Sequence, residues 1–261
     1  MLWSFPMIFH LLREEKEGVS RFDRLLTTLE SQPDWQVIAV SQATREDIIN
    51  LTSIDPYRVH VVSEALPIEA SYEPSESEIE AVKKKYGLQK PFWLTVGTTE
   101  PRKNLRRVIS AWETQRNKSD LVIAGAAGWD NLPKADGIHF LGYVEKGELA
   151  SLYRSAACLV YPSLYEGFGL PILEAYFHQC PVVTARVSSL PEAAGDAAEL
   201  VDPYNIDEIA QACQKIREEK TGARADRVKR MRRQLTRFTW KKAAEKTVHV
   251  YEIAAAKNGA A

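Results

Sequence analysis

Cysteine is scarce in this chain, and neither sign of charge dominates it. Three cysteines occur among 261 residues, namely Cys158, Cys180 and Cys213, and no two of them form a C-x-x-C pair. This pattern argues against a disulfide framework and a structural zinc site, so we expect buried free thiols in a reducing compartment. The net charge of −1 gives no overall attraction to nucleic acid, and we expect no nucleic-acid partner.

The chain also lacks a long apolar run near its start. The apolar stretch from Met1 to Leu12 is shorter than the roughly 20 residues that a membrane-spanning helix needs. It has neither the leading positive charges nor the cleavage site of a signal peptide. We expect it to pack against protein, with an interfacial anchor as the alternative. The expected location is cytoplasmic, either free or peripheral at the inner face of the membrane.

Short apolar runs alternate with helical stripes along most of the sequence. The runs show no polar alternation, which is typical of strands covered on both faces. Strands separated by helices predict βαβ units, and therefore an α/β fold with a Rossmann-like parallel sheet and helices on both faces. Strands are expected at 35–40, 58–62, 92–96, 121–124, 158–161 and 181–184, and helices at 78–86, 105–112, 149–156, 171–179 and 206–217.

Local signals divide the chain near residue 70. Ser41 or Thr44 is expected to cap a helix that ends near Leu51, and the Pro-, Ser- and Glu-rich stretch 67–77 predicts a linker. Ligands of parallel sheets bind at the carboxyl ends of the strands. The loops after the later strands are therefore where chemistry is expected.

The loop after strand 92–96 carries two adjacent cations. Gly97 lets the backbone turn closely, and Arg102 and Lys103 follow at the start of the next helix. Two cations beside a helix N-terminus suit a diphosphate. Taken alone, the loop is better explained by two solvated surface cations.

The loop after strand 158–161 is the most informative part of the sequence. Gly167 and Gly169 let backbone amides approach a ligand, and Pro171 is expected as the first residue of a helix whose N-terminus favours negative charge. Glu166 precedes the glycines, and Glu174 leans back from the helix toward the same place. We interpret both carboxylates as acceptors of hydrogen bonds from sugar hydroxyls. The alternative, a structural role for Glu174 at the helix N-terminus, is outweighed by the composite pattern.

The segment Glu-Gly-Phe-Gly-Leu-Pro-Ile-Leu-Glu-Ala, which starts at Glu166, contains an E-x7-E pair. It resembles the signature of the retaining glycosyltransferases of family 4 (group 1), which have the GT-B fold of two facing Rossmann-like domains. The segment 96–104 resembles the family's phosphate loop, and 140–153 resembles its base-binding segment. The segments 188–195 and 200–203 resemble the stretch after the donor site. The resemblance covers about residues 35–255, mainly the C-terminal donor-binding domain.

The resemblance implies a role for each matching position. Lys103, with Arg102 beside it, would pair with the donor diphosphate, Glu166 would lie by the transferred sugar, and Glu174 would bind the ribose. The family uses no metal, so the cations and the helix dipole would stabilise the leaving diphosphate. No cofactor is expected besides the donor, a GDP- or UDP-linked sugar. The other implied binding positions are Gly97, Thr98 (where many members carry Arg), Tyr143, Val144, Gly167, Phe168, Gly169 and Leu170.

The resemblance also implies three parts and a missing acceptor half. These are a truncated remnant of the N-terminal acceptor-side domain at 1–70, the nucleotide-sugar-binding domain at 71–240, and a helix at 241–261 that crosses back to the N-terminal part. We predict a retaining hexosyltransferase, with mannose as a candidate sugar and a glycan or lipid-linked acceptor. An N-terminal-half partner chain or a homo-oligomer would complete it. The alternative is a sugar-nucleotide-binding module or a subunit of a split transferase, inactive alone.

Two further features bear on these readings. Gly125-Ala-Ala-Gly128 is only part of the G-x-G-x-x-G motif of a dehydrogenase, and no acid–base residues are placed for a hydrolase or epimerase. The segment 224–237 is strongly basic with an apolar side. We expect it to form a solvated helix face, with attraction to anionic lipid as the alternative.

Overall fold

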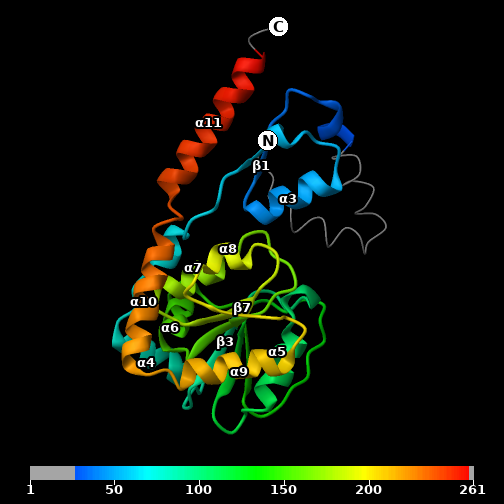
Figure 1. The fold of residues 1–261 in the computed structure, drawn as a ribbon. Coiled ribbons are helices and arrows are strands. Elements are labelled where there is room, and N and C mark those ends of the chain that lie inside the picture. The colour runs from blue at the N-terminus through cyan, green and yellow to red at the C-terminus, as the bar shows by residue number, and fades with distance from the viewer. Residues whose placement is uncertain (1–26, 259–261) are drawn as a thin grey trace. The chain divides into compact units, whose positions relative to one another are not determined.

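The computed structural model describes residues 27–258, which form two compact units (Figure 1). The larger unit comprises residues 66–165 and 169–237, and the smaller comprises 27–65, 166–168 and 238–258. Each unit has its own sheet. No helix within residues 27–258 is both long and apolar enough to cross a membrane.

The larger unit contains a six-stranded sheet in the order β5-β4-β3-β6-β7-β8, with every neighbouring pair parallel. Alternate residues of one strand enter opposite cores, since Phe92 and Leu94 join one cluster and Trp93 the other. The strands are β3 (Phe92–Val96), β4 (Asp120–Ala124), β5 (Ile138–Gly142), β6 (Cys158–Tyr161), β7 (Val182–Ala185) and β8 (Glu199–Val201).

Helices cover both faces of this sheet, which confirms the predicted fold class (Figure 1). Residues of α4, α6, α7, α8 and α10 enter one core cluster, and residues of α5 and α9 enter the other. The bounds are α4 (Glu76–Lys85), α5 (Leu105–Glu113), α6 (Lys146–Ser155), α7 (Leu170–Phe177), α8 (Leu190–Ala194), α9 (Ile206–Arg217) and α10 (Thr221–Leu235).

The smaller unit has a two-stranded parallel sheet of β1 (Val37–Ala39) and β2 (Val59–Val61). Ser41 caps α3 (Gln42–Leu51), because its hydroxyl accepts a hydrogen bond from the Thr44 amide. The last helix is α11 (Trp240–Asn258). The expected packing of the segment 1–12 lies outside the described residues. The interpretation of residues 1–70 as a domain remnant, and of 241–261 as a crossing helix, stays a prediction.

Some boundaries differ from the sequence-based expectation. Helix α4 begins at Glu76, because Ser75 and Glu78 form a reciprocal capping box, so the linker expected at 67–77 ends earlier. A short 3₁₀ helix, η2 (Ile68–Ser71), also lies within it. Strands β5 and β8 were not expected. They form the two edges of the sheet, and their partly exposed residues show no continuous apolar run.

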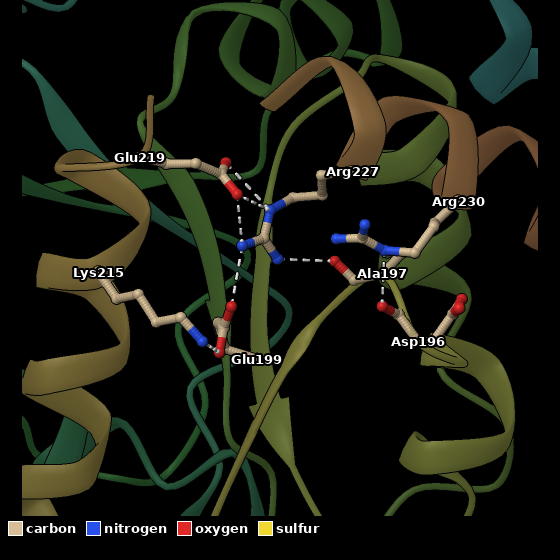
Figure 2. Close-up of polar contacts among 7 residues, drawn as sticks. All are labelled: Asp196, Ala197, Glu199, Lys215, Glu219, Arg227 and Arg230. Atoms are coloured by element: carbon tan, nitrogen blue, oxygen red, sulfur yellow. Dashed lines mark hydrogen bonds and ion pairs between the residues drawn. The ribbon is translucent and has the colours of Figure 1, made fainter. Parts of the chain in front are cut away.

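The expectation of a solvated basic face is wrong for Arg227 of α10. Its side chain is only 4% exposed. The guanidinium donates to Glu219 (Nε to Oε1, 3.0 Å), to Glu199 (Nη2 to Oε1, 2.8 Å) and to the Ala197 carbonyl (2.9 Å), as Figure 2 shows. These acids and the carbonyl satisfy the donors of the buried cation, which offsets the cost of removing its charge from water. Helix α10 therefore turns one arginine inward.

The loops that follow β3 and β4 lie in direct backbone contact. The Gly97 amide donates to the Ala124 carbonyl (3.0 Å), and the Gly128 amide donates to the Thr99 hydroxyl (2.6 Å). A Cβ at Gly125 would lie 2.1 Å from the Gly97 carbonyl oxygen, and a Cβ at Gly128 would lie 2.3 Å from that of Thr99. Gly125 and Gly128 thus allow two loops to touch, which explains these glycines without a dinucleotide motif.

We predict that Gly125→Ala destabilises the protein by about 2–4 kcal/mol, because the added methyl meets backbone that cannot move aside. The free energy of unfolding is measured by chemical denaturation. Gly222→Ala is the matched control, since no atom lies within 4 Å of its added Cβ. In helix α10 that substitution is expected to be neutral or to stabilise by up to about 1 kcal/mol. Equal effects of the two substitutions would contradict the proposed loop contact.

Candidate functional site

The order of strands reverses between β3 and β6. Strands β4 and β5 extend the sheet on one side of this pair, and β7 and β8 extend it on the other. The loops after β3 (residues 97–104) and after β6 (residues 162–165) therefore leave the same edge of the sheet in different directions. Such a switch point is where open α/β sheets bind their ligands.

Lys103 reaches across this switch point. It lies in the short 3₁₀ helix η3 (Pro101–Lys103), and its ammonium donates to the Tyr161 hydroxyl at the end of β6 (2.6 Å). The same ammonium lies 4.7 Å from the centre of the Tyr161 ring, a cation–π distance. A Cβ at Gly97 would come within 3.1 Å of the Lys103 Cε. The structure thus brings Gly97 and Lys103 together, with the lysine largely buried.

Arg102 and Asn104 fasten the β3 loop to the β6 loop. The Arg102 carbonyl accepts from the Leu164 amide (2.8 Å), and its guanidinium pairs with Glu100 (2.8 Å). The Asn104 amide group donates to the carbonyls of Pro162 (3.0 Å) and Pro203 (2.6 Å). Asn104 adopts a left-handed conformation (φ 61°), which asparagine tolerates better than most residues. These contacts fix the backbone on both sides of Lys103.

Helix α7 begins at the same edge of the sheet. Gly169 precedes it with a φ of 110°, a value that favours glycine, and Leu170 and Pro171 form its first turn. Pro171 thus stands one position after the first helical residue. The helix N-terminus offers backbone amides and a favourable dipole to an anion.

Glu174 of α7 is a carboxylate with one buried partner. The Tyr153 hydroxyl of α6 donates to its Oε2 (2.8 Å), and the Tyr153 ring stacks on His178 with 5.8 Å between ring centres. Burial raises the pKa of Glu174, and the hydrogen bond from Tyr153 opposes that rise. Burial also raises the pKa of Tyr153 well above its ordinary value, so this phenol stays a donor.

Glu166, Gly167 and Phe168 group with the smaller unit. There the Thr44 hydroxyl of α3 donates to the Gly167 carbonyl (3.2 Å). The Phe168 ring meets the Phe238 ring edge-on, with 5.1 Å between centres. Glu166 is largely buried. Its predicted role beside a sugar stays a prediction, as do the roles of Gly167 and Phe168.

The predicted base-binding residues follow β5, whose carboxyl end points to the same edge of the sheet. Tyr143 is exposed, whereas the Val144 side chain is buried in the core. The role of both residues at a nucleotide base stays a prediction. Thr98 lies in the β3 loop, where its Cγ2 approaches the loop after β4.

Sequence reasoning did not identify three residues that shape this site. Tyr161 holds Lys103, Asn104 joins three loops, and Tyr153 holds Glu174. The buried Ser163 hydroxyl, in the β6 loop, has no hydrogen-bond partner among the described residues. These three residues and Ser163 lie within or beside the segments that resemble the family. Only the fold shows what each side chain contacts.

Comparisons of the sequence identify a family and several relatives. A family model described as glycosyl transferases group 1 matches residues 77–235. O-antigen chain mannosyltransferase B of Escherichia coli is 34% identical over 233 residues, which is 83% of this chain and 60% of that protein. The serotype-specific mannosyltransferase WbdA of Escherichia coli is 29% identical over 195 residues, 69% of this chain but 24% of its own length. The chain thus spans only part of the relatives it matches.

Solved structures share the fold at low sequence identity. Alr3699/HepE of Anabaena, crystallised with UDP and glucose, has a TM-score of 0.73 at 19% identity, over 83% of this chain and 62% of that one. Sucrose-phosphate synthase of Thermosynechococcus elongatus has a TM-score of 0.75 at 20% identity, over 97% of this chain and 66% of that one.

We predict that Tyr153→Phe raises the pKa of Glu174 further, because it removes the hydrogen bond that stabilises the charged form and leaves the burial in place. The pKa is measured by NMR titration of the side-chain carboxyl. Tyr86→Phe is the control, since the Tyr86 hydroxyl makes the same kind of contact with Glu148 (2.8 Å). It should raise the pKa of Glu148 and leave Glu174 unchanged. A pKa of Glu174 that is the same in Tyr153→Phe and in the unmodified protein would refute the contact.

Proposed function

Because this chain belongs to the glycosyl transferases group 1 family, we propose that it binds a nucleoside diphosphate sugar at the switch point between β3 and β6. We further propose that it is the donor-binding part of a retaining hexosyltransferase of family 4. The observation that carries this proposal is the position of Lys103. Its ammonium lies beside Gly97 and is held at the carboxyl edge of the sheet by Tyr161.

Lys103 and the N-terminus of α7 would share the diphosphate. An ammonium acts on a phosphate as a point charge, and the free amides of a helix N-terminus add directed hydrogen bonds. Arg102 contributes positive potential from the same loop, although its guanidinium is paired with Glu100. No metal is needed in this scheme, because fixed cations and the helix dipole stabilise the charge that develops on the leaving diphosphate. We expect chelators to leave donor binding unchanged.

Glu174 is proposed to accept hydrogen bonds from the ribose hydroxyls. Its charged form is the better acceptor, and the Tyr153 hydroxyl stabilises that form. Tyr143 and Val144 would line the base, the latter through its backbone. Glu166 would accept hydrogen bonds from the transferred sugar, with Gly167, Phe168, Gly169 and Leu170 presenting amides. We propose retention of configuration at the anomeric carbon.

The names of several relatives favour mannose as the sugar, since O-antigen chain mannosyltransferase B and WbdA are both mannosyltransferases. We therefore propose a GDP-linked mannosyl donor, with a UDP-linked hexose as the alternative, and a glycan or lipid-linked acceptor. Such chemistry suits a protein that works in the cytoplasm at the inner face of the membrane.

A second candidate is a binding module without activity of its own. The chain spans 60% of the length of mannosyltransferase B, so a relative of that size has residues that this chain does not match. An acceptor site could then come from a partner chain or from a second copy. Release of free nucleotide from GDP-mannose, with and without added glycan, distinguishes a transferase from a module that binds but does not turn over.

We predict that one of UDP, GDP and ADP, or its hexose conjugate, binds selectively in calorimetry. Lys103→Met should weaken that binding roughly 10- to 100-fold, because a hydrogen bond to a charged group contributes about 1.5–3 kcal/mol. Glu174→Gln should weaken nucleotide binding about 10-fold. The affinity of this variant should also no longer fall at acid pH. Binding by the unmodified protein should decline as pH falls through the raised pKa of Glu174, because the protonated carboxyl accepts less well.

Matched controls keep these changes specific. Lys118→Met and Glu113→Gln alter exposed residues of the same unit and should leave affinity unchanged. Circular dichroism shows whether each variant is folded. The proposal fails if the folded, unmodified chain binds none of the nucleotides, or if Lys118→Met weakens binding as much as Lys103→Met.

A further inference from the structure

Helix α10 is held in one rotational setting by its inner face. Arg227 bonds to Glu199, Glu219 and Ala197, and Arg230 donates to the Asp196 carbonyl (3.0 Å), as Figure 2 shows. Met231 lies fully in the core. Further along, the Gln234 amide group donates to the carbonyls of Glu192 (2.8 Å) and Ala193 (3.1 Å). The helix cannot rotate without breaking these contacts, so its other face is fixed outward.

The outward face of α10 carries a row of three cations with a small uncharged residue at each end. Ala225, Lys229, Arg232, Arg233 and Thr236 are spaced as neighbours along one side of a helix, and all five are exposed. We call Lys229, Arg232 and Arg233 the basic stripe. Arg224 and Arg237 are also exposed and flank it at either end.

The acids near the stripe neutralise it only partly. Lys229 pairs with Asp226 (2.8 Å), and Arg233 pairs with Asp196 (2.5 Å), while no acid other than Asp226 lies on α10. Both pairs are well exposed, and ion pairs of this kind contribute little and yield to competing anions. Together with Arg224 and Arg237, the outward face of α10 thus keeps a net positive charge on a chain whose net charge is −1.

The composition of the stripe limits what it can bind. None of the large exposed apolar side chains lies within α10, which is described along its whole length. The helix therefore has no group to insert into a bilayer and no aromatic ring on which a base could stack. A stripe of this composition binds by charge, and on a chain with no overall basic charge we take a flat, densely anionic membrane surface as its partner.

We propose that the basic stripe of α10 binds the surface of a membrane that contains anionic phospholipid. This inference rests on the proposed function, because a lipid-linked acceptor lies in a membrane and the transferase has to work at its surface. Each basic residue near an anionic surface changes membrane partitioning by about fivefold. The three cations of the stripe thus contribute on the order of 100-fold to membrane partitioning.

Co-sedimentation with vesicles tests this proposal. The probes are vesicles of phosphatidylcholine mixed with phosphatidylglycerol, and vesicles of phosphatidylcholine alone. The full chain should bind the mixed vesicles, fail to bind the neutral ones, and dissociate as salt is raised. The triple variant Lys229→Gln, Arg232→Gln, Arg233→Gln should lose on the order of 100-fold in partitioning. Its exposed positions keep the fold intact, which thermal unfolding checks.

A control with the same change in net charge separates the stripe from overall charge. Lys84→Gln, Lys118→Gln and Lys134→Gln remove three exposed cations elsewhere in the same unit, and this variant should bind the mixed vesicles as the unmodified chain does. Equal losses in the two triple variants would overturn the proposal. The proposal is also overturned if the chain binds neutral vesicles as strongly as mixed ones. It is overturned as well if a nucleic-acid oligomer or inorganic phosphate releases the chain from mixed vesicles at a concentration too low to screen charge.

Calorimetry with the nucleotide sugar keeps this test separate from that of the donor site. The stripe variant should bind donor as the unmodified chain does, and Lys103→Met should bind vesicles normally. If the unmodified chain bound mixed vesicles but no nucleotide sugar, only the proposed function would be refuted.

Discussion

The parallel pairing of β3 with β6 is the contact on which the candidate site depends. These strands are more than sixty residues apart in the sequence, yet Trp93 and Leu94 are paired with Cys158 and Leu159. Because both strands run the same way, their following loops emerge together, and the reversal of strand order keeps those loops from crossing. Lys103 and Tyr161 meet only because of this register.

The site is built from polar groups that are partly removed from water, which makes their partners important. Lys103 lies against a phenol, Glu174 accepts from a second phenol, and Asn104 satisfies carbonyls of two loops. Buried polar groups without partners would destabilise the loops. The hydrogen bonds that position the candidate ligand-binding groups are thus the same ones that stabilise the edge of the sheet.

The sequence predicted the inner strands and the main helices well, because residues such as 92–96 are apolar on both faces. It did not predict β5 and β8, since edge strands need no continuous apolar run. It singled out Glu174 through the glycine-rich segment before its helix, and Lys103 as one of two adjacent cations after a strand, to which the family resemblance gave a role. It did not identify Tyr161 or Tyr153 as their partners, because those contacts join residues that only the packing of distant elements brings together. The burial of Arg227 was not predicted for the same reason. A basic run does not reveal which of its arginines turns toward acids, here Glu199 on β8 and Glu219 before α10.

The contact between Lys103 and Tyr161 affects how tightly an anion could be held. A free lysine side chain has about 2 kcal/mol of rotamer entropy, which it loses when a ligand immobilises it. Here the phenol of Tyr161 orders the ammonium within the fold itself. The loss of side-chain freedom therefore accompanies folding and not association. A phosphate bound as proposed would exchange one oxygen partner for another at a nearly fixed nitrogen, so little of its binding free energy would be spent on ordering Lys103.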